Sequence, residues 1–187
     1  GRLDLVDNDD MKPENLGRHV LGYPALFKRK ADALAEELKR QFPFSKVRSR
    51  VRSAQGLPDL FDADLVIDAT GEEIVSELIN AMRLDRGTDT PVLHVRIRGN
   101  GECVQTFWAQ GRQLGCFRCL LQADHKNYRQ ERFPVLKEQP KRKQLGCSGF
   151  TPYAVSAPMS AAALCMEVVV DWLQSGRATP RFRTSAT

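Results

Sequence analysis

The first thirty residues constrain the fold more than any other part of this chain. A short apolar strand at residues 2–6 ends in Asp7 and Asp9, and a helix begins near Lys30. In an open α/β sheet, ligands bind at the carboxyl ends of the strands, where a carboxylate can accept hydrogen bonds from the hydroxyls of a ribose. Arg18 and Lys30 supply cations of the kind that bind a polyphosphate. This segment therefore predicts half of a nucleotide-binding site.

The other half of such a site is a strand followed by a glycine-rich turn, whose backbone N–H groups hold phosphates at the start of a helix. Gly1 leads directly into the strand at residues 2–6, and no later segment shows this pattern. We therefore expect the chain to be a fragment of a longer polypeptide, with a sheet that is incomplete at its N-terminal side.

Strands and helices alternate along the rest of the chain. The apolar patterns predict strands and helices in an order typical of a doubly wound, mostly parallel α/β sheet. The expected strands are residues 2–6, 46–51, 64–68, 91–97 and 103–108, and the expected helices are residues 27–42, 74–82 and 160–174. A glycine-rich turn at residues 99–101 separates the last two strands. In the second helix we expect one apolar face to be buried, formed by Ile74, Val75, Leu78, Ile79 and Met82.

Composition sets the broad class of the protein. At 187 residues, 42% of them hydrophobic and 27% charged, the chain is large enough for one core and is expected to form a single domain. We see no secretory signal and no apolar run long enough to span a membrane. The five cysteines form an odd set without a secretory context, which favours a reducing compartment. A cytoplasmic location is therefore expected.

The net charge of +5 is concentrated in one segment. Residues 126–143 hold seven basic and two acidic residues, which equals the whole excess of the chain. A nucleic-acid surface would place several aromatic side chains among these cations for stacking on bases, and here only Tyr128 and Phe133 are available. We therefore expect a solvated basic loop, with no nucleic acid and no membrane among the partners.

Three motifs occur in a fixed order along the chain. They are Asp7-x-Asp9-x5-Asn15-x2-Arg18-x11-Lys30, then Asp64-Leu65-Val66-Ile67-Asp68-Ala69-Thr70, then Gly115-Cys116-Phe117-Arg118-Cys119-Leu120. This ordered set resembles the ThiF/MoeB and ubiquitin-activating (E1-like) superfamily of adenylating enzymes. The resemblance implies a Rossmann-like fold with a crossover loop and a C-terminal helix. It places a partial adenylation domain at residues 1–176 and a tail at residues 177–187.

The resemblance also implies an activity. Members use ATP and Mg²⁺ to adenylate the C-terminal glycine of a ubiquitin-like or sulfur-carrier protein. It implies a ribose ligand at Asp7 and phosphate ligands, with catalytic roles, at Arg18 and Lys30. The implied nucleotide site also includes Asp9, Asn15 and Asp68. Lys28 and Arg29 are expected to be solvated.

Cys147 is the candidate nucleophile. It lies between glycines in Leu145-Gly146-Cys147-Ser148-Gly149, after the basic loop and before the apolar helix. Its position resembles the thioester cysteine of E1-like relatives, most closely that of the homodimeric autophagy activator. The chain also resembles divergent bacterial activators, which implies a homodimer, a conjugating enzyme as a partner and a role in antiviral defence. Cys103 and Cys165 are expected to be packed in the core.

One position departs from the family pattern. Gly71 stands where members usually carry an aspartate that holds magnesium. Asp68, Glu72 or Glu73 are the available substitutes, since magnesium needs few protein oxygens. Two alternatives therefore stay open: a non-catalytic subunit of a heterodimeric activator, and a dinucleotide-dependent oxidoreductase, whose fold shares an acidic strand end.

Cys116 and Cys119 have the spacing of half a tetrahedral zinc site. A structural zinc site needs a second pair, and Cys147 and Cys165 stand alone. We therefore expect a metal-free pair, or a site whose second half lies outside this chain, rather than bound zinc.

Overall fold

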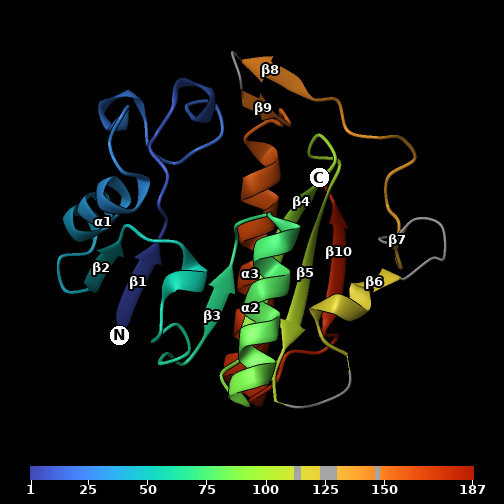
Figure 1. The fold of residues 1–187 in the computed structure, drawn as a ribbon. Coiled ribbons are helices and arrows are strands. Elements are labelled where there is room, and N and C mark those ends of the chain that lie inside the picture. The colour runs from blue at the N-terminus through green and yellow to red at the C-terminus, as the bar shows by residue number, and fades with distance from the viewer. Residues whose placement is uncertain (112–114, 123–129, 146–147) are drawn as a thin grey trace. The chain divides into compact units, whose positions relative to one another are not determined.

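The computed structural model describes residues 1–111, 115–122, 130–145 and 148–187 (Figure 1). The chain divides into two compact units, residues 1–60 and residues 61–187.

Unit 1 is built on a parallel pair of strands, β1 (Arg2–Val6) and β2 (Lys46–Arg50). The helix α1 (Lys30–Gln41) connects them and packs mainly against β2. Short 3-10 turns lie at η1 (Pro13–Asn15), η2 (Tyr23–Ala25) and η3 (Ala54–Gly56). A small apolar cluster, formed by Met11, Leu21, Ala25 and Ala33, holds the loop between β1 and α1 against the helix.

The start of α1 differs from the prediction. Phe27 was expected on the apolar face of the helix, but the helix begins at Lys30, and Phe27 is 73% exposed. Its backbone is left-handed, with φ 62°, a conformation that bulky residues rarely adopt. The chain turns there so that the N–H groups of Phe27 and Met11 donate to the carbonyls of Met11 and Lys28, both at 2.8 Å.

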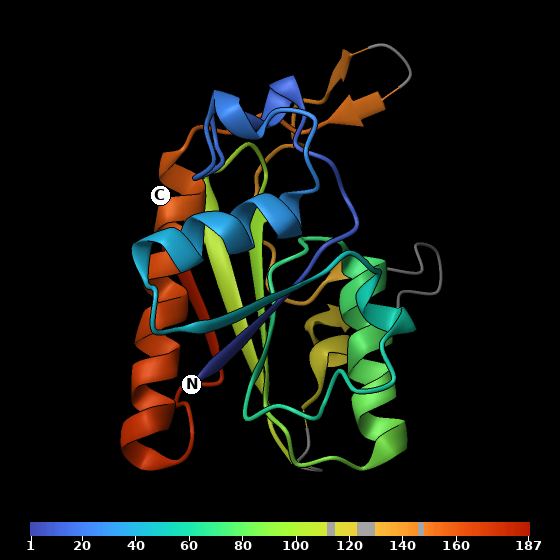
Figure 2. The same ribbon diagram turned by 90° about the vertical axis from the view of Figure 1, so that its left-hand side faces the viewer.

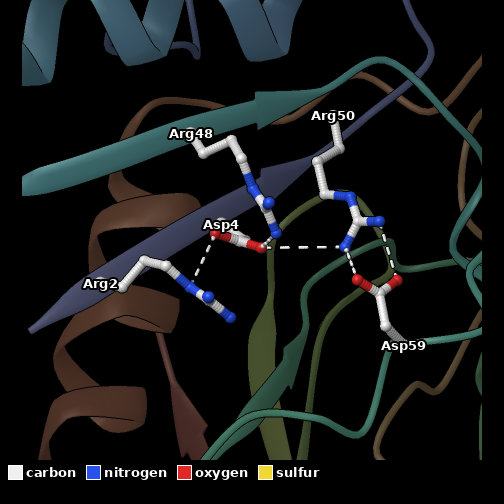
Figure 3. Close-up of polar contacts among 5 residues, drawn as sticks. All are labelled: Arg2, Asp4, Arg48, Arg50 and Asp59. Atoms are coloured by element: carbon white, nitrogen blue, oxygen red, sulfur yellow. Dashed lines mark hydrogen bonds and ion pairs between the residues drawn. The ribbon is translucent and has the colours of Figure 1, made fainter.

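An ionic cluster lies on one side of the two strands of unit 1 (Figure 3). Asp4 on β1 forms ion pairs with Arg48 and, at 3.8 Å, with Arg50 on β2. Arg50 also donates both guanidinium nitrogens to Asp59, at 2.7 and 2.8 Å. This two-pronged contact fastens the segment after β2 back onto the strand pair.

Unit 2 is built on a four-stranded sheet in the order β10-β5-β4-β3. β3 (Val66–Asp68) is parallel to β4 (Val92–Arg98), whereas β5 (Cys103–Ala109) and β10 (Phe182–Ala186) continue the sheet in antiparallel pairings. The α/β class is confirmed, but the sheets are mixed rather than mostly parallel. Residues 182–186, placed in the expected tail, form the edge strand next to β5.

Two helices cover opposite faces of this sheet (Figure 2). α2 (Glu73–Arg86) connects β3 to β4, and α3 (Ser156–Ser175) packs on β4 and β5. The main core lies under α3, where Leu93, Val104 and Trp108 from the sheet meet Leu164 and Val168 from the helix. The segment before α3 contains η4 (Phe117–Leu120) and two short antiparallel pairs, β6 (Leu121–Gln122) with β7 (Gln130–Glu131) and β8 (Lys143–Leu145) with β9 (Ser148–Phe150).

α3 corrects one expectation about membranes. No apolar run of membrane-spanning length was expected, yet α3 is long and apolar enough to cross a membrane by length and composition. One stripe of the helix, which includes Ala157, Ala161, Leu164 and Val168, is buried within unit 2. A core helix passes the same test of length and composition, and this stripe shows that α3 contributes to the core.

The buried face of α2 matches the prediction at Ile79, which is 2% exposed, and differs from it elsewhere. Ile74 is 66% exposed and Leu78 is 42% exposed, although both were expected to be buried. The buried stripe is instead formed by Ser76, Ile79, Asn80 and Arg83. Three of these four side chains are polar, so α2 meets the rest of unit 2 largely through hydrogen bonds.

Candidate nucleotide and thiol sites

In unit 1, the end of β1 brings Asp7, Asp9 and Lys30 together. The Asp7 Oδ1 accepts the N–H of Asp9 at 2.7 Å, which turns the chain sharply after the strand. The N–H of Lys30 donates to the carbonyl of Asp9 at 2.9 Å, and the Lys30 Nζ lies 3.0 Å from the Asp9 Oδ2. The predicted grouping of these residues is therefore present in the structure, whereas their roles toward a nucleotide stay predictions.

Lys30 differs from its two basic neighbours. Its side chain is 16% exposed, whereas Lys28 and Arg29 are exposed and Arg29 forms an ion pair with Asp10 at 3.2 Å. Lys30 is also the first residue of α1, where the helix dipole disfavours a cation and favours an anion. A mostly buried lysine at the start of a helix is suited to bind a phosphate.

Asn15 and Arg18 lie on the turn that precedes this site. The Asn15 Oδ1 accepts the N–H of Lys12 at 2.9 Å, and the Asn15 carbonyl accepts the N–H of Arg18 at 3.0 Å. Asn15 therefore shapes the turn on which Arg18 sits.

Sequence reasoning missed His19, which is half-buried. Burial lowers the pKa of His19, the charge of Lys30 lowers it further, and the charge of Asp7 raises it. Its position directly after Arg18 was the available signal.

In unit 2, Asp68 ends β3 in a buried polar network. It is 3% exposed, and its Oδ2 accepts from the Ser76 hydroxyl at 2.5 Å and from His94 Nδ1 at 2.7 Å. Its Oδ1 accepts from the N–H and the hydroxyl of Thr70, at 3.1 and 2.7 Å. Burial opposes ionisation of Asp68, but the hydrogen bonds and the charge of His94 outweigh it and lower the pKa. Both oxygens are engaged inside unit 2, so a nucleotide role for Asp68 stays a prediction.

The described residues do not provide a preformed magnesium site. They contain no group of three or more histidine, cysteine or acidic side chains that could hold a metal ion, and the Asp68 oxygens are already hydrogen-bonded. Gly71 has a left-handed backbone with φ 69°, and a Cβ added there would meet open space. The position is thus free of steric obstruction, although it carries no ligand.

Cys116 and Cys119 meet at the start of η4. Their Sγ atoms are 3.9 Å apart, and the N–H of Cys119 donates to the carbonyl of Cys116 at 2.8 Å. Burial opposes ionisation of Cys116, but hydrogen bonds from Asn80, from Cys119 and from backbone N–H groups lower its pKa. Among the described residues, no third histidine, cysteine or acidic side chain accompanies this pair, so the zinc half-site stays a prediction.

The remaining thiols have separate environments. Cys147, the predicted nucleophile, lies outside the described residues. Cys103 is buried and Cys165 is half-buried, and burial raises the pKa of both thiols. They are therefore packing residues, as expected.

A cavity of about 400 Å³ lies between α3 and β10 in unit 2, and none of the predicted site residues lines it.

Nearly the whole chain is similar to one known protein family. The model of the ThiF family matches residues 1–183. The chain belongs to the ThiF family. It is 38% identical to the ATP-dependent ubiquitin transferase-like protein Cap2 of Pseudomonas aeruginosa, over 98% of this chain and 33% of that protein. It is 29% identical to Cap2 of Escherichia coli, over 92% of this chain and 30% of that protein.

The chain thus spans about a third of the length of these relatives. Among solved structures, E. coli MccB with ATP superposes with a TM-score of 0.71 at 18% identity, covering 100% of this chain and 53% of that one. E. coli MccB with a succinimide superposes with a TM-score of 0.72 at 18% identity, covering 100% of this chain and 54% of that one. At this identity the likeness establishes the fold, and the Rossmann-like α/β prediction is confirmed.

Proposed function

We propose that the full-length protein acts in the cytoplasm as an E1-like activator that uses ATP to adenylate the C-terminal carboxylate of a ubiquitin-like or sulfur-carrier protein. The observation that carries this proposal is the placement of Lys30. Its ammonium group is partly buried at the start of α1 and paired with Asp9, whose N–H donates to Asp7 directly after β1. A lysine in that place is poised to exchange its carboxylate partner for a phosphate.

The proposed chemistry has two steps. Asp7 accepts hydrogen bonds from the ribose, while Lys30 and Arg18 stabilise the negative charge of the triphosphate. The carboxylate of the modifier attacks the α-phosphorus, and the bond to the β-phosphate oxygen breaks to release pyrophosphate. The thiolate of Cys147 then attacks the acyl-adenylate carbonyl, AMP leaves, and the product is a thioester.

The names of the relatives support the substrate class. Cap2 is described as an ATP-dependent ubiquitin transferase-like protein, which agrees with a ubiquitin-like modifier and ATP as substrates. On this basis we also propose a homodimer, a conjugating enzyme as the acceptor of the thioester and a role in antiviral defence. Membership of the ThiF family leaves the oxidoreductase alternative without support.

Exchange of pyrophosphate into ATP tests the first step. In the full-length protein with candidate modifiers, Lys30→Ala should cost about 3 kcal/mol of transition-state stabilisation, which is about a hundredfold in rate. Lys28→Ala is the matched control, since Lys28 is two residues away and exposed, and it should leave the rate nearly unchanged. Equal slowing by the two variants would show that Lys30 has no specific role.

Cys147→Ala separates the two steps. Pyrophosphate exchange should persist, because adenylation precedes the need for a thiol, whereas the thioester should disappear. Gly71 favours one alternative, a non-catalytic subunit of a heterodimeric activator, because the residue offers no magnesium ligand. Exchange that occurs only after a second, catalytic subunit is added would establish that alternative.

A further inference from the structure

His19 lies directly after Arg18 in a turn of unit 1. We propose that His19 is a positioning residue of the nucleotide site: its imidazole braces the turn that carries Arg18 and so sets the place of the Arg18 guanidinium toward the triphosphate of ATP. This role rests on the proposed function, since it requires that ATP is bound. It makes His19 a determinant of nucleotide affinity that acts through Arg18 and not through contact with the nucleotide.

The stretch from Arg18 to Leu21 is held at both ends. At one end, the carbonyl of Asn15 accepts the N–H of Arg18 at 3.0 Å. At the other end, Leu21 is 6% exposed and belongs to the apolar cluster of unit 1. Gly17 and Gly22 flank the stretch, and glycine gives the backbone more conformational freedom than any other residue. The place of Arg18 therefore depends on how firmly the stretch is joined to Leu21.

The imidazole of His19 supplies this join. Its Nδ1 accepts the N–H of Leu21, two residues along the chain, at 3.1 Å. Asparagine and aspartate fix turns through the same contact, from a side chain to the N–H two residues on. His19 is half-buried, which shields its hydrogen bond in part from competition with water. Arg18 thus lies between two hydrogen bonds, one on each side of it along the chain.

Only a neutral imidazole can brace the turn in this way. Nδ1 accepts a hydrogen bond only when it carries no proton, so the ring keeps its proton on Nε2. Burial lowers the pKa of His19, the charge of Lys30 lowers it further, and the charge of Asp7 raises it. The ring is therefore neutral at pH 7. Because Lys30 and Asp7 both act on it, His19 lies within the predicted nucleotide site.

A direct contact between His19 and the nucleotide is the competing role. That contact would use the Nε2–H group, since Nδ1 is engaged by Leu21. The two roles therefore use different nitrogens of one ring, and amide side chains of two lengths separate them. Asparagine accepts the N–H two residues on, as Nδ1 does. Glutamine is one methylene longer, so its amide reaches the region of Nε2 and not that of Nδ1.

Calorimetric titration of the full-length protein with ATP and Mg²⁺ at pH 7 measures the Kd of each variant. His19→Asn keeps an acceptor for the Leu21 N–H and should bind ATP as the wild type does. His19→Gln loses that acceptor and should raise the Kd about fivefold, the usual effect of one lost hydrogen bond. Val20→Ala is the matched control, since Val20 is the next residue and 79% exposed, and it should leave the Kd unchanged.

A double-mutant cycle tests whether the effect passes through Arg18. Arg18→Ala should weaken ATP binding more than His19→Gln does, because it removes the group that is positioned. In the Arg18→Ala background, His19→Gln should raise the Kd by less than about twofold, since the brace then has no guanidinium to place. A residue that only stabilised the fold would weaken binding equally in both backgrounds.

Three results would overturn the proposal. One is that His19→Asn weakens ATP binding and His19→Gln does not, which would assign a direct contact through Nε2. Another is that His19→Gln leaves the Kd of the wild-type background unchanged. The third is an equal effect of His19→Gln with and without Arg18. In all three cases Lys30→Ala still weakens ATP binding if the proposed function is right, whereas a wild type that binds no ATP would refute the proposed function and this role together.

Discussion

The carboxylate of Asp68 joins β3, α2 and β4, and its removal tests whether this network stabilises unit 2. In Asp68→Ala, the buried side chains of Ser76 and His94 lose their acceptor. Each buried donor left unpaired costs about 1–3 kcal/mol, so the two donors together cost about 2–6 kcal/mol. We therefore expect the free energy of unfolding to fall by about 4 kcal/mol.

Urea denaturation at pH 7 measures this change. Trp108 and Trp172 report on unit 2, since their rings lie 5.6 Å apart in its core. Ser76→Ala is the matched control, because it removes one donor and leaves the carboxylate with its other contacts. It should cost about 1 kcal/mol. A loss below about 1 kcal/mol in Asp68→Ala, or a larger loss in Ser76→Ala, would refute this account.

The same network predicts a pH dependence. Burial raises the pKa of Asp68, but the hydrogen bonds and charge of His94, with Ser76 and Thr70, lower it below the ordinary value of 3.8. A carboxylate whose pKa is lowered by folding stabilises the protein above its unfolded pKa, and this contribution is lost as the pH falls through the folded pKa. The stability difference between wild type and Asp68→Ala should therefore be full at pH 7 and shrink below pH 3.8.

Two further predictions concern the backbone at Gly71 and the edge strand β10. Gly71→Ala should lower the free energy of unfolding by about 1 kcal/mol, because the backbone there is left-handed. The control Gly56→Ala, at an open site without a left-handed backbone, should leave the free energy of unfolding unchanged. Equal melting temperatures of the two variants would contradict this prediction. Deletion of residues 177–187 should lower the melting temperature and cause aggregation, because it uncovers the edge of β5; light scattering that shows a monodisperse, equally stable variant would argue against it.

Most strands of the two units could be predicted from local pattern. The strands at residues 2–6, 46–51, 91–97 and 103–108 match β1, β2, β4 and β5 within a residue or two. The antiparallel pairing of β4 and β5 could also have been predicted, since a turn as short as residues 99–101 permits only an antiparallel connection. β10 could not be predicted, because Phe182–Ala186 is short and largely polar. Only its pairing with β5 defines it as a strand.

The candidate site could be predicted only where its residues lie near one another in the sequence. Asp7, Asp9 and Lys30 meet because β1 and α1 are adjacent in sequence. The surroundings of Cys116 could not be predicted, because Asn80 belongs to the polar stripe of α2. Apolar periodicity predicted Ile74 and Leu78 on the same side of that helix as Ile79. Hydrogen bonding in the folded unit instead buries polar residues beside Ile79 and leaves Ile74 and Leu78 exposed.

The polar stripe of α2 has a consequence for how this helix tolerates mutation. In most surface helices the buried positions accept exchange among apolar residues, and the outer positions accept polar ones. Here the inner positions Ser76, Asn80 and Arg83 each serve a particular acceptor or donor, so an apolar replacement leaves that partner unsatisfied. A saturation library of α2 should therefore show an inverted profile, with strict identity on the inner face and wide freedom at Ile74 and Leu78.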